Sequence, residues 1–136
     1  MSAVAAASWK RRRLGERLGR YVLGSVIGAG GAAAVYMARL DGPRGFERLL
    51  ALKIVHEHLL EDSGFVEMFL DEANLAVRLA HPNIVHAYEL AHQGELLFLS
   101  MEYLQGKPLS RVYARAFERG APLPYELVAF IGARAA

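Results

Sequence analysis

The sequence contains no cysteine among its 136 residues, which excludes disulfide bonds, thiol chemistry and zinc sites built from cysteine. No apolar run approaches the ~18–20 residues that a membrane-spanning helix requires. The opening segment MSAVAAASW is apolar, but its positive charges follow it, whereas a secretory signal has them in front. These absences predict a chain without a membrane span that lies in the cytoplasm.

A metal site is not expected from the histidines. They include one i, i+2 pair, but no set of histidines and carboxylates has the spacing of metal ligands. We therefore predict no metal held by protein side chains. The five histidines are His56, His58, His81, His86 and His92.

The net charge is only +2, but the charged residues are unevenly distributed along the chain. Residues 1–20 carry six basic side chains against Glu16, a net charge of +5, so the rest of the chain carries −3. We expect residues 1–17 to form a basic flexible tail. Such a stretch can contact nucleic acid or anionic lipid, but it is more often solvated, so nucleic acid is not an expected partner.

Three separated features are typical of a site that holds the phosphates of ATP. A glycine-rich segment, IGAGGAAAV, runs from Ile27 to Val35 and is followed by Lys53 in ALKIV and Glu72 in FLDEANLAVRL. Glycine lets backbone approach phosphate oxygens, lysine neutralises their charge, and the glutamate fixes the lysine. A plain hairpin turn and a purely structural lysine–glutamate pair are the alternatives.

Two other phosphate-binding motifs do not fit. A Walker-type loop closes with Gly-Lys-Ser/Thr, whereas Ala33, Ala34 and Val35 close this one. A dinucleotide-binding turn needs a helix after the glycines and an acidic residue about twenty positions on. Here VYMARL reads as a strand, and Lys53 stands where the acidic residue would be.

Two further segments complete a pattern: HPNIV at His81–Val85 and LFLSMEYLQGKPL at Leu97–Leu109. Together with the three features above, in this order, they resemble the N-terminal lobe of a protein kinase, particularly the bacterial eukaryote-like Ser/Thr kinases. The resemblance covers the chain from about Leu18 to its end. It implies that residues 18–104 form a kinase N-lobe, and that residues 105–136 form the hinge exit and the start of a truncated C-lobe.

The expected fold is therefore α+β: a five-stranded antiparallel sheet with one long helix, followed by the first helices of an incomplete C-lobe. Apolar periodicity and turn residues place the elements. The expected strands are Tyr21–Ile27, Val35–Leu40, Leu49–Val55, Ile84–Ala91 and Leu96–Tyr103, and the expected helices are Gly64–Ala80, Leu109–Arg119 and Tyr125–Ala136.

The resemblance also implies roles for individual residues. Lys53 and Glu72 would be the catalytic ion pair, Val35 and Ala51 would cover the adenine ring, and Met101 would limit the back of its pocket. The carbonyl of Glu102 and the amide of Leu104 would bond adenine. The loop residues that would contact the nucleotide are Ile27, Gly28, Ala29, Gly30 and Gly31. Ala33 stands where the family pattern has a third glycine, which predicts a loop that closes less well on phosphate.

The catalytic HRD motif and the metal-binding DFG motif of protein kinases do not occur in the sequence. The resemblance implies ATP, Mg²⁺ and a protein substrate, but the ligands for Mg²⁺ are missing. The favoured hypothesis is the ATP-binding piece of a Ser/Thr kinase that needs a missing C-lobe segment. The alternatives are a pseudokinase-like module that binds a nucleotide or a partner, and a nucleic-acid-binding protein. Without a second lobe, we expect Leu79, Leu97 and apolar residues of the last two helices to be partly exposed.

Overall fold

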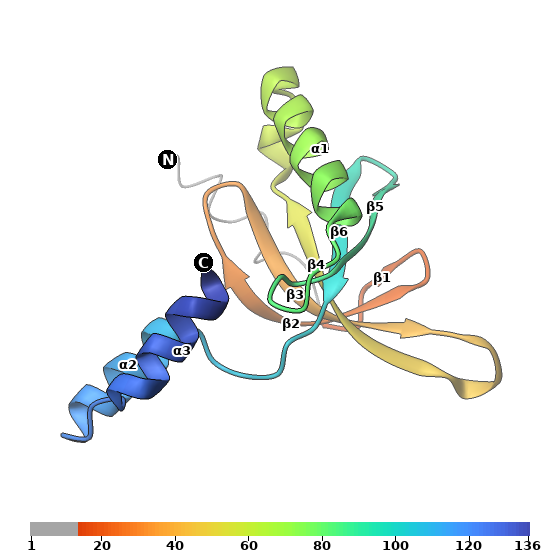
Figure 1. Ribbon diagram of the computed structural model, residues 1–136. Helices are drawn as coiled ribbons and strands as arrows, with labels where there is room; N and C mark the ends of the chain where they lie inside the picture. Colours follow the sequence, from red (N-terminus) through yellow and green to blue (C-terminus); the bar gives the residue numbers. More distant parts are fainter. Residues whose placement is uncertain (1–13) are drawn as a thin grey trace. The chain divides into compact units, whose positions relative to one another are not determined.

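The structure is a computed structural model that describes residues 14–136, in two compact units (Figure 1). The first unit ends at Tyr103 and the second comprises Leu104–Ala136. Residues 1–13, most of the predicted basic tail, lie outside the described residues.

The first unit is built on one antiparallel sheet in the order β1-β2-β3-β4-β6-β5. The strands are β1 (Arg17–Leu18), β2 (Tyr21–Ala29), β3 (Ala33–Asp41), β4 (Glu47–Val55), β5 (Ala87–Gln93) and β6 (Leu96–Glu102). The antiparallel order confirms the predicted fold class. It also excludes a nucleotide-binding βαβ unit, since β2 is followed directly by β3 and not by a helix.

The sheet has six strands where five were expected, because a two-residue strand precedes the first predicted one. Arg17 and Leu18 pair with Val22 and Tyr21 across a turn in which Gly19 has a φ of +58°, a conformation that favours glycine. Leu18 is buried in the core. The sheet therefore reaches one residue into the segment expected to be a tail.

Alternating side chains of the sheet form two apolar clusters, one on each face. On one face, Leu50, Leu52 and Ile54 of β4 pack with Tyr36 of β3 and Phe98 of β6. The other face carries the cluster that includes the helix α1 (Ser63–Arg78). The candidate site depends on this division, because it fixes which β4 side chains lie on the same face as α1.

Helix α1 begins at an aspartate cap and packs its apolar side on the sheet. The carboxylate of Asp62 accepts a hydrogen bond from the amide of Phe65 at 3.1 Å. Phe69 and Ala73 are buried against Val55, Ala87, Leu97 and Leu99. The helix ends at Arg78, two residues before the predicted end, ahead of the His81-Pro82 pair.

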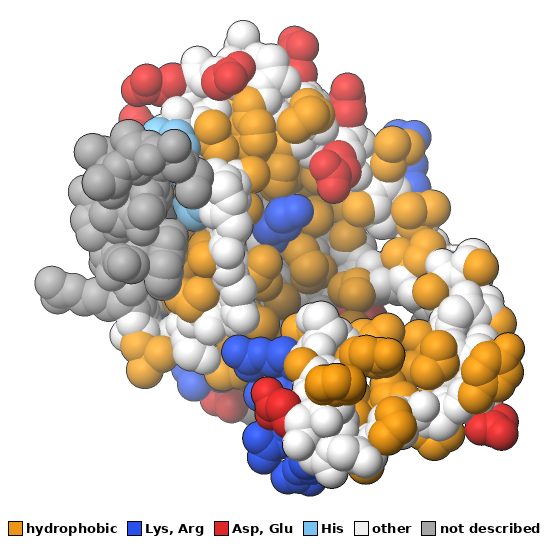
Figure 2. Space-filling view, turned by 90° about the vertical axis from the view of Figure 1, so that its left-hand side faces the viewer, with side chains coloured by type: hydrophobic (Ala, Val, Ile, Leu, Met, Phe, Trp, Pro, Cys, Tyr) orange, Lys and Arg blue, Asp and Glu red, His pale blue; other side chains and the backbone are white. Residues whose placement is uncertain are grey.

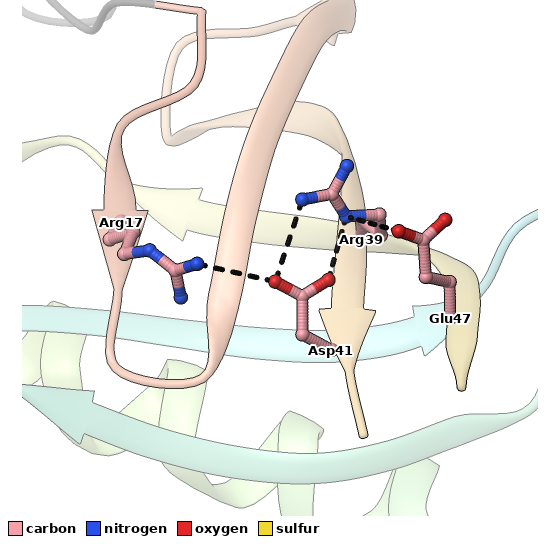
Figure 3. A network of polar contacts seen from close by, with 4 residues as sticks. All are labelled: Arg17, Arg39, Asp41 and Glu47. Carbon is pink, nitrogen blue, oxygen red and sulfur yellow. Dashed lines mark hydrogen bonds and ion pairs between the residues drawn. The ribbon is translucent and has the colours of Figure 1, made fainter. Parts of the chain in front are cut away.

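A network of ion pairs joins the ends of three strands (Figure 3). The carboxylate of Asp41 accepts from Arg39 at 2.7 Å and from Arg17 at 3.3 Å, and Arg39 also lies 3.7 Å from Glu47. The hydrogen bond from Arg39 lowers the pKa of Asp41. Because the guanidinium groups are exposed, the network fixes the local strand geometry and adds little stability.

A second polar network joins β2 to β5. The hydroxyl of Tyr21, which is buried, donates to the Glu89 carboxylate, and Arg20 pairs with the same carboxylate at 2.7 Å. Burial raises the pKa of Tyr21, while the hydrogen bond from Tyr21, followed by the one from Arg20, lowers the pKa of Glu89. The backbone of Glu89 is bonded in turn to the buried hydroxyl of Ser100.

The second unit contains two helices, α2 (Leu109–Glu118) and α3 (Tyr125–Ala135), each following a proline. Gly120, with a φ of +64°, ends the α2 segment. Most of the large apolar side chains of both helices are exposed, as predicted. Leu79 is also exposed, but the prediction for Leu97 was wrong: it has no exposed surface, because α1 covers it.

Candidate nucleotide-binding site

Strand register brings together several predicted site residues from three strands. Residues directly opposite one another in an antiparallel pair point their side chains to the same face. Val35 of β3, Lys53 of β4 and Leu99 of β6 are opposite partners and form one row across the sheet. The row beside it consists of Met37, Ala51 and Met101.

These two rows lie on the face of the sheet that α1 covers in part. Leu99 and the half-buried Met101 belong to the cluster around Phe69 and Ala73 of α1, whereas Leu52, the neighbour of both Ala51 and Lys53, belongs to the opposite cluster. The two rows therefore combine small and apolar side chains with one cation, Lys53. Such a surface is suited to an apolar ring beside an anionic group.

Glu72 lies at the edge of the buried side of α1. At about 100° per residue it is about 60° around the helix axis from Phe69 and about 100° from Ala73, both of which are buried. Its own side chain is exposed. The ion pairs formed within residues 14–136 do not include one between Lys53 and Glu72. Lys53 and Glu72 thus share one side of the sheet without direct contact, and their joint role stays a prediction.

The glycine-rich segment forms the tip of the hairpin between β2 and β3. β2 ends at Ala29, β3 begins at Ala33, and the amide of Gly30 donates to the carbonyl of Ala33 at 2.9 Å. Gly28 pairs with Val35, which leads into the row containing Lys53. The five predicted loop residues, Ile27, Gly28, Ala29, Gly30 and Gly31, are all exposed.

Two glycines on β2 are explained in different ways. At Gly24, an added Cβ would come within 3.0 Å of the Met37 carbonyl oxygen, so packing excludes a side chain. At Gly28, an added Cβ would meet nothing within 4 Å, and φ is not in the left-handed region. The fold therefore does not require glycine at position 28. The free space beside this backbone is consistent with a ligand that approaches it closely.

The predicted hinge is reached at the end of β6. The amide of Glu102 donates to the carbonyl of His86 at 2.8 Å, and the Glu102 carboxylate accepts from the amide of His86 at 3.3 Å. These bonds fix Glu102 to the segment before β5. Leu104, the other predicted hinge residue, begins the second unit.

Sequence reasoning missed one residue that touches the glycine-rich segment. His56 follows β4, three positions after Lys53, and only 5% of it is exposed. Its ring nitrogen Nε2 lies 2.8 Å from the carbonyl oxygen of Gly30. In the sequence, His56 was weighed only as a possible metal ligand. The available signal was a polar residue directly after the apolar run LLALKIV.

A concavity of about 700 Å³ in the second unit does not contain any of the predicted site residues. It runs along α2 and is lined by side chains from Lys107 to Ala121.

None of the helices within residues 14–136 has the length and apolar character of a membrane span.

Comparison with known proteins identifies the family to which this arrangement belongs. The model of the protein kinase domain matches residues 21–131, which is most of the chain. The chain belongs to the protein kinase family. The match begins at the first residue of β2 and extends into α3, so it includes both rows of site residues.

Two curated relatives of this kinase chain are bacterial proteins. It is 42% identical over 117 residues to the tyrosine-protein kinase MasK of Myxococcus xanthus, covering 85% of this chain and 18% of that protein. It is 39% identical over 100 residues to the serine/threonine-protein kinase PrkC of Bacillus subtilis, covering 71% of this chain and 14% of that protein. The kinase chain therefore spans less than a fifth of the length of these relatives.

The fold agrees with that of solved kinase domains. The crystal structure of the Mycobacterium tuberculosis PknI kinase domain matches with a TM-score of 0.71 and 26% identity. The match covers 92% of this chain and 48% of the PknI chain. About half of a kinase domain is thus present in the sequence.

Proposed function

We propose that this chain is the ATP-binding part of a serine/threonine protein kinase. The observation that carries the proposal is the register of β3, β4 and β6. It puts Lys53 in line with Val35, with Ala51 and Met101 in the next row, on one face of the sheet. In this family the lysine holds phosphates, and the small and apolar residues enclose adenine.

The chemistry of this face fits a nucleotide. An adenine ring would pack on Val35, Ala51 and Met101, and the carbonyl of Glu102 and the amide of Leu104 would bond its edge. The triphosphate would lie between Lys53 and the exposed backbone of residues 27–31. The open space beside Gly28 supports this position, because, apart from Gly28 and its two chain neighbours, no atom of residues 14–136 lies within 4 Å of where a Cβ would stand.

Phosphoryl transfer requires groups that the sequence does not contain. The HRD aspartate that accepts the substrate proton and the DFG aspartate that holds Mg²⁺ are both absent. We therefore propose that the chain alone binds ATP without transferring phosphate, and that it acts with a segment that carries these motifs. A protein hydroxyl group would then be the acceptor. PrkC is named a serine/threonine kinase, whereas MasK is named a tyrosine kinase.

A nucleotide- or partner-binding module without transferase activity is the second candidate. The exposed Glu72, which has no ion pair with Lys53, favours it, because an active kinase requires that pair. In this case Mg-ATP would bind, and a supplied C-terminal lobe would not restore transfer.

Titration of the 136-residue chain with Mg-ATP tests the proposal. We expect weak binding, with a dissociation constant in the high micromolar to millimolar range, or about −4 to −5 kcal/mol. Lys53→Met should weaken it by about tenfold or more, because a charge-assisted contact to phosphate is lost. Lys107→Met, at an exposed lysine of the second unit, is the matched control and should bind as the wild type does.

Radiolabelled ATP with a generic protein substrate tests the second half of the proposal. We expect no label on protein from the chain alone. Label that is transferred, and lost in Lys53→Met, would show that the chain is catalytically complete. Equal ATP affinity in the wild type and Lys53→Met would contradict the assigned binding face.

A further inference from the structure

His56 is a buried polar residue at a junction between the glycine-rich hairpin, the lysine strand and the path to α1. Its ring contacts the carbonyl of Gly30 at 2.8 Å, and its amide donates to the carbonyl of Ala32 at 3.0 Å. Its own carbonyl accepts from the amide of Leu59, at the turn that leads towards α1. Ring and amide therefore both bond the tip of the glycine-rich hairpin, and the carbonyl bonds the turn that leads towards α1.

The direction of the ring contact follows from the chemistry of its partner. A carbonyl oxygen can only accept, so Nε2 of His56 must carry the proton and donate it to Gly30. His58 stacks on the same ring at 5.8 Å between centroids, with 17° between the ring planes. The ring is therefore held in orientation by burial, stacking and its own hydrogen bond.

The position of the acceptor suggests a role beyond packing. Gly30 lies at the exposed tip between β2 and β3, where only its amide bond to Ala33 closes the turn from within the hairpin. Two small residues, Gly31 and Ala32, complete the tip and give it no side-chain anchor. The backbone amide of His56 holds Ala32, and the bond from its buried ring to the Gly30 carbonyl adds a side-chain restraint at the start of the tip.

We propose that His56 is a positioning residue that fixes the tip of the glycine-rich loop above the face carrying Lys53. It does not touch the nucleotide; it acts through Gly30. By ordering the loop before the ligand arrives, it lowers the entropy cost of binding phosphates. This inference rests on the proposed binding of a nucleoside triphosphate. Its tests distinguish a failure of the His56 role from a failure of the proposed ATP binding.

The first test needs no variant. In a ¹⁵N-labelled chain without ligand, NMR should show His56 as the tautomer with a proton on Nε2, and the Gly30 and Gly31 amides as ordered as the strands. An unprotonated Nε2, or a loop as mobile as a free chain end, would overturn the proposal. This result does not depend on whether ATP binds.

The second test compares His56→Leu, which removes the donor, with His56→Gln, whose side-chain amide restores an N–H at a similar reach. We expect His56→Leu to disorder the loop amides and weaken Mg-ATP binding by about three- to tenfold, the range of one neutral hydrogen bond. His56→Gln should recover most of both effects. His92→Leu, at an exposed histidine on β5, is the matched control and should change neither.

Adenosine distinguishes positioning from a general structural role. It lacks phosphates, so its affinity should be equal in the wild type and His56→Leu. An equal loss for adenosine and ATP, or a loss that His56→Gln does not recover, would mean that His56 only supports the core. If the wild type binds neither ligand, the proposed function fails. The loop order of the His56 variants alone then decides whether the bond from His56 to Gly30 orders the loop.

Discussion

Gly24 and Gly28 lie on the same strand, yet the structure gives glycine a different reason at each position. A side chain at position 24 would press on the Met37 backbone, while one at position 28 would enter open space. The same substitution should therefore lower stability at position 24 and weaken ligand binding at position 28.

We expect Gly24→Ala to lower the free energy of unfolding by about 1–3 kcal/mol, because the added methyl overpacks against backbone that cannot rotate away. Gly28→Ala should leave stability unchanged or raise it by up to about 1 kcal/mol, since it restricts the unfolded chain. Urea denaturation measures both. In the Mg-ATP titration, Gly28→Ala should bind more weakly, and unchanged affinity would argue against close approach of phosphate to this backbone.

At the residue scale, the alternation of side chains along a strand can be followed in the sequence of β4. The two-residue period of ALKIV separates Ala51 and Lys53 from Leu52 and Ile54, and the structure has this separation. His56 was missed because its partner is a backbone carbonyl 26 residues away. No periodicity of side chains encodes such a contact, which exists only once the hairpin is folded.

At the element scale, α1 begins beside two residues whose side chains can cap a helix, Asp62 and Ser63. The structure assigns the bond to Asp62. We expect Asp62→Ala to destabilise the chain by about 1 kcal/mol, as the amide of Phe65 loses its acceptor. Ser63→Ala, the matched control inside the first turn, should change the unfolding midpoint little. The reverse ranking in thermal or urea unfolding would move the cap to Ser63.

The polar network of Tyr21, Arg20 and Glu89 between β2 and β5 should make the stability of the sheet depend on pH. The pKa of Glu89 is lowered in the folded state, so below the ordinary glutamate pKa of about 4.3 the unfolded chain binds more protons than the folded one. This contribution to stability is present above that pH and is lost as pH falls through the lowered value. Stability curves of Glu89→Gln should therefore converge with the wild type at low pH. A constant gap between pH 3 and 7 would contradict the assignment.

The bounds of the predicted elements agree with the structure to within three residues, because turn formers and prolines mark most ends, whereas the two-residue β1 was not predicted. The burial of Leu97 was not predicted correctly. Its strand was predicted, but the pattern of β6 did not reveal which apolar residues α1 would bury, since LLFL is apolar on both faces. A run of this kind predicts a central strand. It does not show which element covers each of its two faces, because tertiary packing decides this.

At the scale of the whole molecule, a large apolar surface is not covered by the part of the chain that the structure describes. The exposed side chains of Met68 and Leu75 on α1, and of Leu79 directly after its end, form a strip beside Glu72, with exposed fractions of 59%, 65% and 50%. Figure 2 shows hydrophobic side chains gathered at the surface of one face. In the second unit, Phe117 and Tyr125 are more exposed still.

Exposed apolar surface of this extent favours contact with another protein surface over contact with water. We therefore expect the purified chain to associate as its concentration rises, measured by light scattering or sedimentation. Leu75→Gln combined with Leu79→Gln should reduce this association while changing the free energy of unfolding by no more than about 0.5 kcal/mol per site, because both side chains are already in water.

Leu97→Ala is the contrasting variant for this prediction. Leu97 has no exposed surface, so the substitution leaves a cavity between α1 and the sheet and should destabilise the chain by about 2–5 kcal/mol. The unfolded fraction then exposes more apolar surface, and association should increase. A wild-type chain that stays monomeric at all concentrations and unfolds sharply at high temperature would contradict the expectation. So would a Leu75/Leu79 double variant that associates as the wild type does, since the α1 strip would then not be the surface in contact.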